Sequence, residues 1–389
     1  MTIDFSSNAI VGSIPSELGL LTSVILLSVS SNQLTGPIPL ELGQLTNIIA
    51  LSLLDNKLTG TLPTEIGQLT NLAIIWLSAN FLKGTLPSEI GSLTSLTLLH
   101  LFKNQLTGAL PTEIGNLKNA VNFDASFNLF NGKFPTEFGF FTKLTSLYLE
   151  DNQLTGAIPT EIGNLTSLLE FRGYSNQFNG TLPTEIGFLT SLMFLYLLDN
   201  QLTGALPTEI GNLMNLADFR AHKNLFNGTL PTEIGFLTSL TLLYLFENQL
   251  TGSFPTEIGN LTSLLDFGAY SNHFNSTLPT EIGFLTSLTL LYIYNNSFTG
   301  TIPSEFGNLE NIATIDGSTN QFNGTLPTEI GYLSNLRLLY LQINHLAGVL
   351  PAEIGNLTSL TNFEIHSNMF TGVIPTDIGL MSSLSKFCI

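Results

Sequence analysis

An asparagine recurs at every 24th position, from Asn8, Asn32 and Asn56 through to Asn368, in sixteen copies and without one insertion or deletion. A period of about 20 to 29 residues is typical of solenoid proteins, in which each repeat buries its apolar face only by stacking on its neighbours. The constant register therefore predicts one elongated array. We expect residues 1–389 to form a single solenoid domain without a linker, with an incomplete and uncapped repeat at each end.

Each repeat carries a strand signal before its asparagine. Residues 99–102 alternate with a period of two, which predicts a short strand whose leucines point inward and whose His100 and Phe102 point outward. The amide of Asn104 has two donors and one acceptor, and we expect it to bind backbone groups of the turn and of the next repeat. Stacked copies of this strand predict a parallel sheet with a column of asparagines along one edge.

A turn signal follows the asparagine. Gly108 permits close backbone approach, and Pro111 ends ladder hydrogen bonding. Residues 112–115 predict a short helical turn with Thr112 as its cap and Glu113 in an acidic first turn.

These residues resemble the leucine-rich repeats, and specifically their plant-type subclass, over essentially the whole chain. The motif is carried in one copy by Leu96, Leu99, Leu101, Asn104, Leu106, Gly108, Leu110 and Pro111. The resemblance implies an α/β repeat solenoid: a curved array of about sixteen leucine-rich repeats, each 24 positions long, with a parallel β-sheet on the concave side and short 3-10 or helical turns on the convex side. It also implies a secreted or receptor-like ectodomain, as in plants and algae, that binds peptides, proteins or glycans on its concave face.

A second period, twice as long, overlies the first from about Asn104 onward. Repeats with a Leu-x-Leu strand core alternate with repeats in which Phe is followed by Ala or Gly, which predicts that large and small core residues alternate between layers. The repeats of the second kind have further phenylalanines, and we interpret these as core residues too: Phe178, Phe226, Phe274, Phe188, Phe236 and Phe284.

Charge is scarce and strongly acidic. Charged residues make up 10% of the chain and the net charge is -18, which argues against nucleic acid and anionic membranes as partners. No run approaches the roughly 18 apolar residues of a membrane span. One glutamate recurs in each repeat from Glu17 to Glu353, and Asp377 ends the column. We attribute this column to the helical turns; a cation-binding strip is the alternative.

No enzymatic motif occurs in the sequence. Phosphate-binding glycine loops, metal-spaced Cys/His sets and nucleophile elbows are missing, so neither catalysis nor a cofactor is expected.

The outward strand positions favour recognition. Tyrosine recurs at every second repeat of the central column, and all three arginines, including Arg337, fall on the predicted strands. Repeats lie about 4.8 Å apart in a parallel sheet, so guanidinium groups are expected between aromatic rings. Strand propensity and duplication could also account for the tyrosines. The predicted ligand-binding residues are Trp76, His100, Tyr148, Arg172, Tyr174, Tyr196, Arg220, His222, Tyr244, Phe246, Tyr270, Tyr292, Tyr294 and Tyr340.

Threonine columns support ice binding as an alternative function. The candidate ice face is Thr61, Thr85, Thr181, Thr229, Thr277, Thr301 and Thr325. Ala109, Lys133, Ala157 and Ala205 interrupt this column. A second column, which includes Thr112, has a sufficient role as helix caps.

Eight N-x-S/T sequons favour an extracellular or cell-surface location, although a repeat rich in Asn and Thr also generates sequons by chance. They begin at Asn164, Asn179, Asn227, Asn260, Asn275, Asn295, Asn323 and Asn356. The sole cysteine, Cys388, has no partner within the chain. Apolar residues at the two ends, such as Phe5 and Ile389, allow end-to-end or homo-oligomeric association, although truncation explains them more simply.

Overall fold

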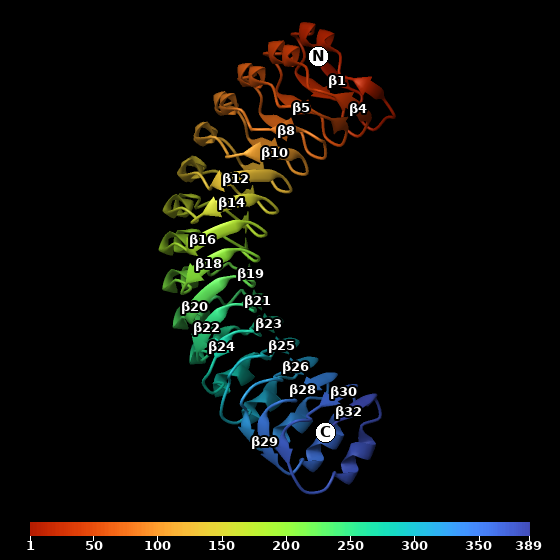
Figure 1. Ribbon diagram of the computed structural model, residues 1–389, viewed down its shortest axis with the longest axis vertical. Coiled ribbons are helices and arrows are strands. Elements are labelled where there is room, and N and C mark those ends of the chain that lie inside the picture. The colour runs from red at the N-terminus through yellow and green to blue at the C-terminus, as the bar shows by residue number, and fades with distance from the viewer. The chain divides into compact units, whose positions relative to one another are not determined.

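The computed structural model describes all 389 residues, and its contacts divide the chain into two compact units, Met1–Asn200 and Gln201–Ile389. Figure 1 shows that each unit is a succession of similar coils, with strands and 3-10 turns following one another in repeat order. No α-helix occurs between residues 1 and 389. Repeats of strand and 3-10 turn confirm the predicted solenoid within each unit, while the single-domain assignment stays a prediction.

The first unit contains a parallel sheet of nine strands that pair in chain order. Each residue pairs with the residue 24 positions later, as Leu99 does with Phe123. The strands are β1 (Thr2–Asp4), β3 (Leu26–Ser28), β5 (Ala50–Ser52), β7 (Ile74–Trp76), β9 (Leu98–His100), β11 (Asn122–Asp124), β13 (Ser146–Tyr148), β15 (Glu170–Arg172) and β17 (Phe194–Tyr196).

The second unit contains eight parallel strands with the same register. They are β19 (Asp218–Arg220), β21 (Leu242–Tyr244), β23 (Asp266–Gly268), β25 (Leu290–Tyr292), β26 (Thr314–Asp316), β28 (Leu338–Tyr340), β30 (Asn362–Glu364) and β32 (Lys386–Cys388). The predicted parallel sheet is thus confirmed in both units.

A second set of short strands follows the asparagines. In the first unit these are β2 (Val11–Ser13), β4 (Gln33–Gly36), β6 (Lys57–Leu58), β8 (Lys83–Gly84), β10 (Gln105–Gly108), β12 (Leu129–Lys133), β14 (Gln153–Gly156) and β16 (Gln177–Thr181). In the second unit they are β18 (Gln201–Gly204), β20 (Leu225–Thr229), β22 (Gln249–Gly252), β24 (His273–Phe274), β27 (Asn323–Gly324), β29 (His345–Gly348) and β31 (Met369–Phe370).

Every repeat then forms a 3-10 turn of five residues. The first unit has η1 (Ser16–Leu20), η2 (Leu40–Gln44), η3 (Thr64–Gln68), η4 (Ser88–Ser92), η5 (Thr112–Asn116), η6 (Thr136–Phe140), η7 (Thr160–Asn164) and η8 (Thr184–Phe188). The second has η9 (Thr208–Asn212), η10 (Thr232–Phe236), η11 (Thr256–Asn260), η12 (Thr280–Phe284), η13 (Ser304–Asn308), η14 (Thr328–Tyr332), η15 (Ala352–Asn356) and η16 (Thr376–Leu380).

The predicted helical turn is confirmed, but the predicted threonine cap is wrong. Pro111 occupies the N-cap position with φ -69° and ψ 144°, and no side chain caps the turn. Thr112 is already the first helical residue, one position too late to reach the free N–H groups. Its hydroxyl lies 3.4 Å from the Glu113 carboxylate instead. Glu113 does lie in the first turn, as predicted.

The asparagine column binds backbone groups of two repeats. The Asn104 amide nitrogen donates to the carbonyl oxygens of Leu77 (3.1 Å) and Leu101 (3.0 Å), and its Oδ1 accepts the N–H of Leu82 at 3.0 Å. Two of these three partners belong to the preceding repeat, so the expectation of contacts to the next repeat had the direction wrong. The residue before each asparagine has a positive φ, such as 56° at Lys103.

The core confirms the alternation of large and small residues. Phe171 and Phe178 are completely buried, and a Cβ placed on Gly173 would lie 3.2 Å and 3.3 Å from their rings. Phe226 and Phe274 are buried in the same way. Glycine at 173 therefore accommodates the phenylalanines of its own layer.

Three other phenylalanines contradict the packing interpretation. Phe188, Phe236 and Phe284 are 60%, 54% and 56% exposed. Each is the last residue of its 3-10 turn, where the side chain lies outside the apolar interior. The sequence pattern placed them one turn after buried phenylalanines and could not show this outward direction.

Candidate functional site

The outward side chains of the first strand set form a surface that we call the sheet face. Its central column lies four residues before each asparagine, and its second column lies two residues before it. All predicted ligand-binding residues lie there and are partly exposed, except His222, which is 8% exposed. Arg337 is different, because it lies just before β28 (Leu338–Tyr340), not within it.

Central-column side chains bond to the neighbouring strand, a feature that was not predicted from the sequence. In each case the hydrogen-bond partner is the residue 22 positions later, at the start of the next strand. The pairs are His100 Nε2 with Asn122 Oδ1 at 3.0 Å, the Tyr148 hydroxyl donating to Glu170 at 2.7 Å, the Tyr244 hydroxyl donating to Asp266, and the Asn362 amide donating to the Tyr340 hydroxyl at 3.2 Å. These partners are polar residues of every second repeat, so the doubled period extends to the surface.

In the first unit, Arg172 lies between two aromatic rings as predicted. Its guanidinium carbon is 4.7 Å from the Tyr148 ring centre and 5.8 Å from that of Tyr196. It also bonds Glu170 on its own strand, with Nε at 2.7 Å and a terminal nitrogen at 2.6 Å. Glu170 thus receives a tyrosine hydroxyl and an arginine together, which fixes the position of all three side chains.

The second unit has one equivalent pair of an arginine and a carboxylate, and one carboxylate that has no arginine on its own strand. Arg220 binds Asp218 through Nε (2.9 Å) and a terminal nitrogen (2.8 Å), and lies 5.8 Å from the Tyr244 ring centre. On strand β23 (Asp266–Gly268) the arginine position is Gly268. Oδ1 of Asp266 is buried without a hydrogen-bond partner. Burial raises the pKa of Asp266, although its hydrogen bond from Tyr244 opposes this effect.

The second column of this unit forms a continuous aromatic stack. Ring centres are 4.0 Å apart between His222 and Phe246, and 4.3 Å apart for both Phe246 with Tyr270 and Tyr270 with Tyr294. The last two pairs are within 9° of parallel. Burial lowers the pKa of His222 to about 4, so its ring is neutral at physiological pH. These four residues were predicted from the sequence as ligand-binding residues, but their stacking was not.

A buried carboxyl group lies in the second column of the first unit. Glu150 is 3% exposed, one of its oxygens has no hydrogen-bond partner, and the other lies 3.8 Å from Arg172. Burial, with a smaller contribution from Asp124, raises its pKa to about 7. The carboxylates of this face were not predicted, although acidic residues at the start of every second strand (Glu170, Asp218 and Asp266) were a readable signal.

The alternative sites are exposed. All seven threonines of the candidate ice face and all eight sequon asparagines are accessible. Glycines pack against the threonine methyl groups; a Cβ on Gly300 would lie 2.6 Å from Cγ2 of Thr277. Because Thr112 does not cap its turn, the cap no longer accounts for the second threonine column. Ice binding and sequon occupancy stay predictions.

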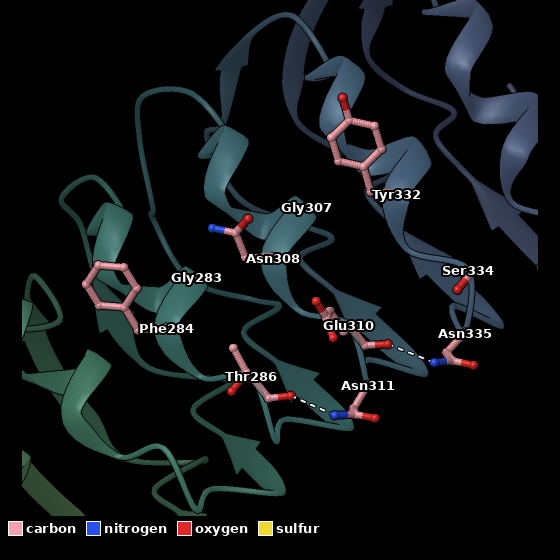
Figure 2. A pocket seen from close by; sticks show the side chains of 10 residues that line it. All are labelled: Gly283, Phe284, Thr286, Gly307, Asn308, Glu310, Asn311, Tyr332, Ser334 and Asn335. Carbon is pink, nitrogen blue, oxygen red and sulfur yellow. Dashed lines mark hydrogen bonds between the residues drawn. The ribbon is translucent and has the colours of Figure 1, made fainter.

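The opposite side of the second unit carries a groove between 3-10 turns. Figure 2 shows Phe284 on one side of Asn308 and Tyr332 on the other. Asn311 and Asn335 are each hydrogen-bonded to the preceding coil. The Asn311 amide donates to the Thr286 carbonyl at 2.9 Å, and the Asn335 amide to the Glu310 carbonyl at 2.8 Å. None of the predicted ligand-binding residues lines this groove.

The fold offers neither a metal site nor a membrane-spanning helix. No group of three or more His, Cys, Asp or Glu side chains is placed to share a metal ion. No helix has the length and apolar character needed to cross a bilayer.

Comparisons with known proteins agree with this architecture. The Leucine Rich Repeat family profile matches residues 95–117, 143–165, 239–261 and 287–309. The chain is similar to the plant peptide hormone receptor RGFR1 in complex with RGF2, with 37% identity, 98% of this chain and 62% of that chain covered, and a TM-score of 0.94. A comparison with curated protein sequences gives no match.

Two further solved structures are similar. The Arabidopsis receptor kinase HAESA, in complex with the peptide hormone IDA and the co-receptor SERK1, shares 30% identity over 99% of this chain and 65% of that chain, with a TM-score of 0.88. A leucine-rich-repeat protein of Leptospira interrogans shares 33% identity over 99% of this chain and 89% of that chain, with a TM-score of 0.69. The chain spans less than two thirds of each of the two receptor chains. Repeat motif, parallel strands and these similarities together establish that the chain belongs to the leucine-rich-repeat family.

Proposed function

We propose that the sheet face of the second unit binds a peptide or a protein segment outside the cell, without catalysis. The stack of His222, Phe246, Tyr270 and Tyr294 carries this proposal. Rigid aromatic side chains anchor interfaces because they bury a large area at low cost in conformational entropy. Similarity to receptors in complex with peptide hormones supports a peptide as the ligand and an extracellular location.

The carboxylates beside the stack favour a ligand with a basic side chain. Asp218 already binds Arg220, whereas Asp266 has Gly268 in place of an arginine and one oxygen without a partner. A guanidinium or ammonium group of the ligand would supply the missing donor between Tyr244 and Tyr292. The free oxygen of Asp266 is buried, and the Tyr244 ring lies over Gly268, 3.1 Å from a Cβ placed there. We therefore expect this ring to move aside when the ligand binds.

Selection of random peptides on the immobilised full chain tests this function. We expect the selected peptides to be enriched in Arg and Lys, and to bind Tyr270→Ala at least about tenfold more weakly than the unsubstituted chain. Tyr332→Ala is the matched control, since Tyr332 is the one tyrosine outside the sheet face and is 67% exposed. Peptides that lose affinity for Tyr332→Ala and not for Tyr270→Ala would place the site elsewhere.

A further inference from the structure

Exposed aromatic residues recur along the 3-10 turns of each unit. Every second turn from η6 to η14 ends in an aromatic residue: Phe140 and Phe188 in the first unit, and Phe236, Phe284 and Tyr332 in the second. Each side chain is more than half exposed. Soluble proteins rarely expose large apolar side chains in a regular series without something that covers them.

Asparagines occupy the turns between these rings. Asn260 ends η11 (Thr256–Asn260) and is exposed. It lines a groove together with Phe236, which precedes it by one repeat, and Phe284, which follows it by one repeat. Thr262 lines the same groove, and its N–H donates to the Asn260 carbonyl at 2.8 Å.

The three residues Asn260, Leu261 and Thr262 form a sequon for N-linked glycosylation. We propose that Asn260 carries an N-linked glycan whose first sugars lie in this groove and stack on the rings of Phe236 and Phe284. In its attachment, Asn260 Nδ2 loses a proton and bonds to the anomeric carbon of a lipid-linked oligosaccharide, and the lipid diphosphate leaves. The glycan is the occupant that covers the exposed rings. This inference depends on the extracellular location proposed above, and it is independent of the peptide site on the sheet face.

The chemistry of the groove fits a sugar. One face of a pyranose presents C–H groups, which the electron-rich face of an aromatic ring attracts, while its hydroxyl groups remain in water. The attachment atom Nδ2 belongs to a residue that lines the groove itself, so the first sugar begins beside both rings. Asn164 in the first unit has a similar neighbour, since the Phe188 ring lies 3.0 Å from a Cβ placed on Gly163.

The test uses the full chain secreted from eukaryotic cells. Glycopeptide mass spectrometry measures occupancy at Asn260, and thermal unfolding is followed for the unsubstituted chain, Asn260→Gln, Phe236→Ala/Phe284→Ala, and the triple variant. We expect Asn260 to be occupied. We expect Asn260→Gln to lower Tm by roughly 1–3 °C in the parent chain and to have no effect when both phenylalanines are replaced.

Asn227→Gln is the matched control. This sequon lies on β20 (Leu225–Thr229), is exposed, and does not line the groove. Its substitution should shift Tm equally with and without the phenylalanines. An unmodified Asn260, or a glycan whose loss lowers Tm equally in both backgrounds, would overturn the proposal. The proposal would also be overturned if the unmodified chain formed a dimer in light scattering and the Phe236→Ala/Phe284→Ala variant were monomeric, because a second copy of the chain would then cover the groove.

Discussion

The Tyr148 hydroxyl donates a 2.7 Å hydrogen bond to Glu170 on the adjacent strand. The same bond joins Tyr244 to Asp266 in the second unit. The surroundings of the two acceptors differ, because Arg172 also binds Glu170 whereas Gly268 leaves one oxygen of Asp266 without a partner. Tyrosines at equivalent positions therefore have unequal structural importance.

Replacing these tyrosines by phenylalanine should show that difference. Tyr148→Phe should lower the free energy of unfolding by about 1 kcal/mol, since Glu170 keeps its arginine. Tyr244→Phe should cost about 1–3 kcal/mol, since it removes the hydrogen bond that Asp266 receives. Urea unfolding of the two variants under identical conditions provides the comparison. Equal losses would show that the arginine does not compensate.

Glu150 should make stability depend on pH. Burial raises its pKa from the ordinary 4.5 to about 7, so the folded state binds the proton more tightly than the unfolded state. This contribution is fully present below pH 4.5 and is lost as pH rises through 7. It amounts to at most about 3 kcal/mol. The change in the free energy of unfolding that Glu150→Gln causes should therefore be more favourable at pH 8 than at pH 5. Urea unfolding of the variant and the unsubstituted chain at both pH values measures it.

The His222 ring should remain neutral well below pH 6. Burial lowers its pKa to about 4, and protonation would place a charge inside the aromatic stack. The stability due to the neutral ring is present above the ordinary pKa of 6.5 and is lost as pH falls through 4. An NMR titration of its ring protons, assigned by comparison with His222→Gln, should give a midpoint near 4. A midpoint above 6 would contradict the burial of this ring.

Asn104 should be far more important than an exposed asparagine. Asn104→Ala removes the hydrogen bonds to Leu77, Leu82 and Leu101, and a longer one to Phe102 at 3.5 Å. Buried backbone groups of two repeats are then unpaired, which should cost on the order of 2–5 kcal/mol. Hydrogen exchange should show lost protection at the Leu82 amide. Asn119 makes only exposed bonds: its amide donates to the Thr94 carbonyl at 3.0 Å, and its Oδ1 accepts from Lys143 Nζ at 2.8 Å. Asn119→Ala should cost less than about 1 kcal/mol. Continued protection of the Leu82 amide would argue against the asparagine column as a source of cohesion.

The repeat made most of the fold predictable. Strict spacing of Asn104 and its equivalents implied the register, and alternation around Leu99 implied which strand residues are buried. The helix cap was mispredicted because a proline at position 111 takes the N-cap, so that Thr112 falls inside the turn. Exposure of Phe188 was missed because periodicity gives distance along the repeat and not the direction of a side chain within the turn.

The candidate site was predictable only in part. Counting back from each asparagine located eight of the nine tyrosines together with Arg172 and Arg220, since every strand has the same phase, whereas Arg337 lies just before its strand. Their partners were not predictable, because a contact such as Tyr148 with Glu170 depends on how far a side chain leans across to the next strand. Stacking of Phe246 on Tyr270 depends in the same way on rotamers, which the sequence does not specify.

Pairing between residues 22 positions apart restricts how this protein can change length. Removal of the single repeat 149–172 would place the Tyr148 hydroxyl opposite Phe194 in place of Glu170. A partly buried phenol would then lose its acceptor, and the large-small alternation of the core would also be broken. Removal of two consecutive repeats preserves both relations. From about Asn104 onward, loss of a pair of repeats should therefore disturb this chain less than loss of a single repeat.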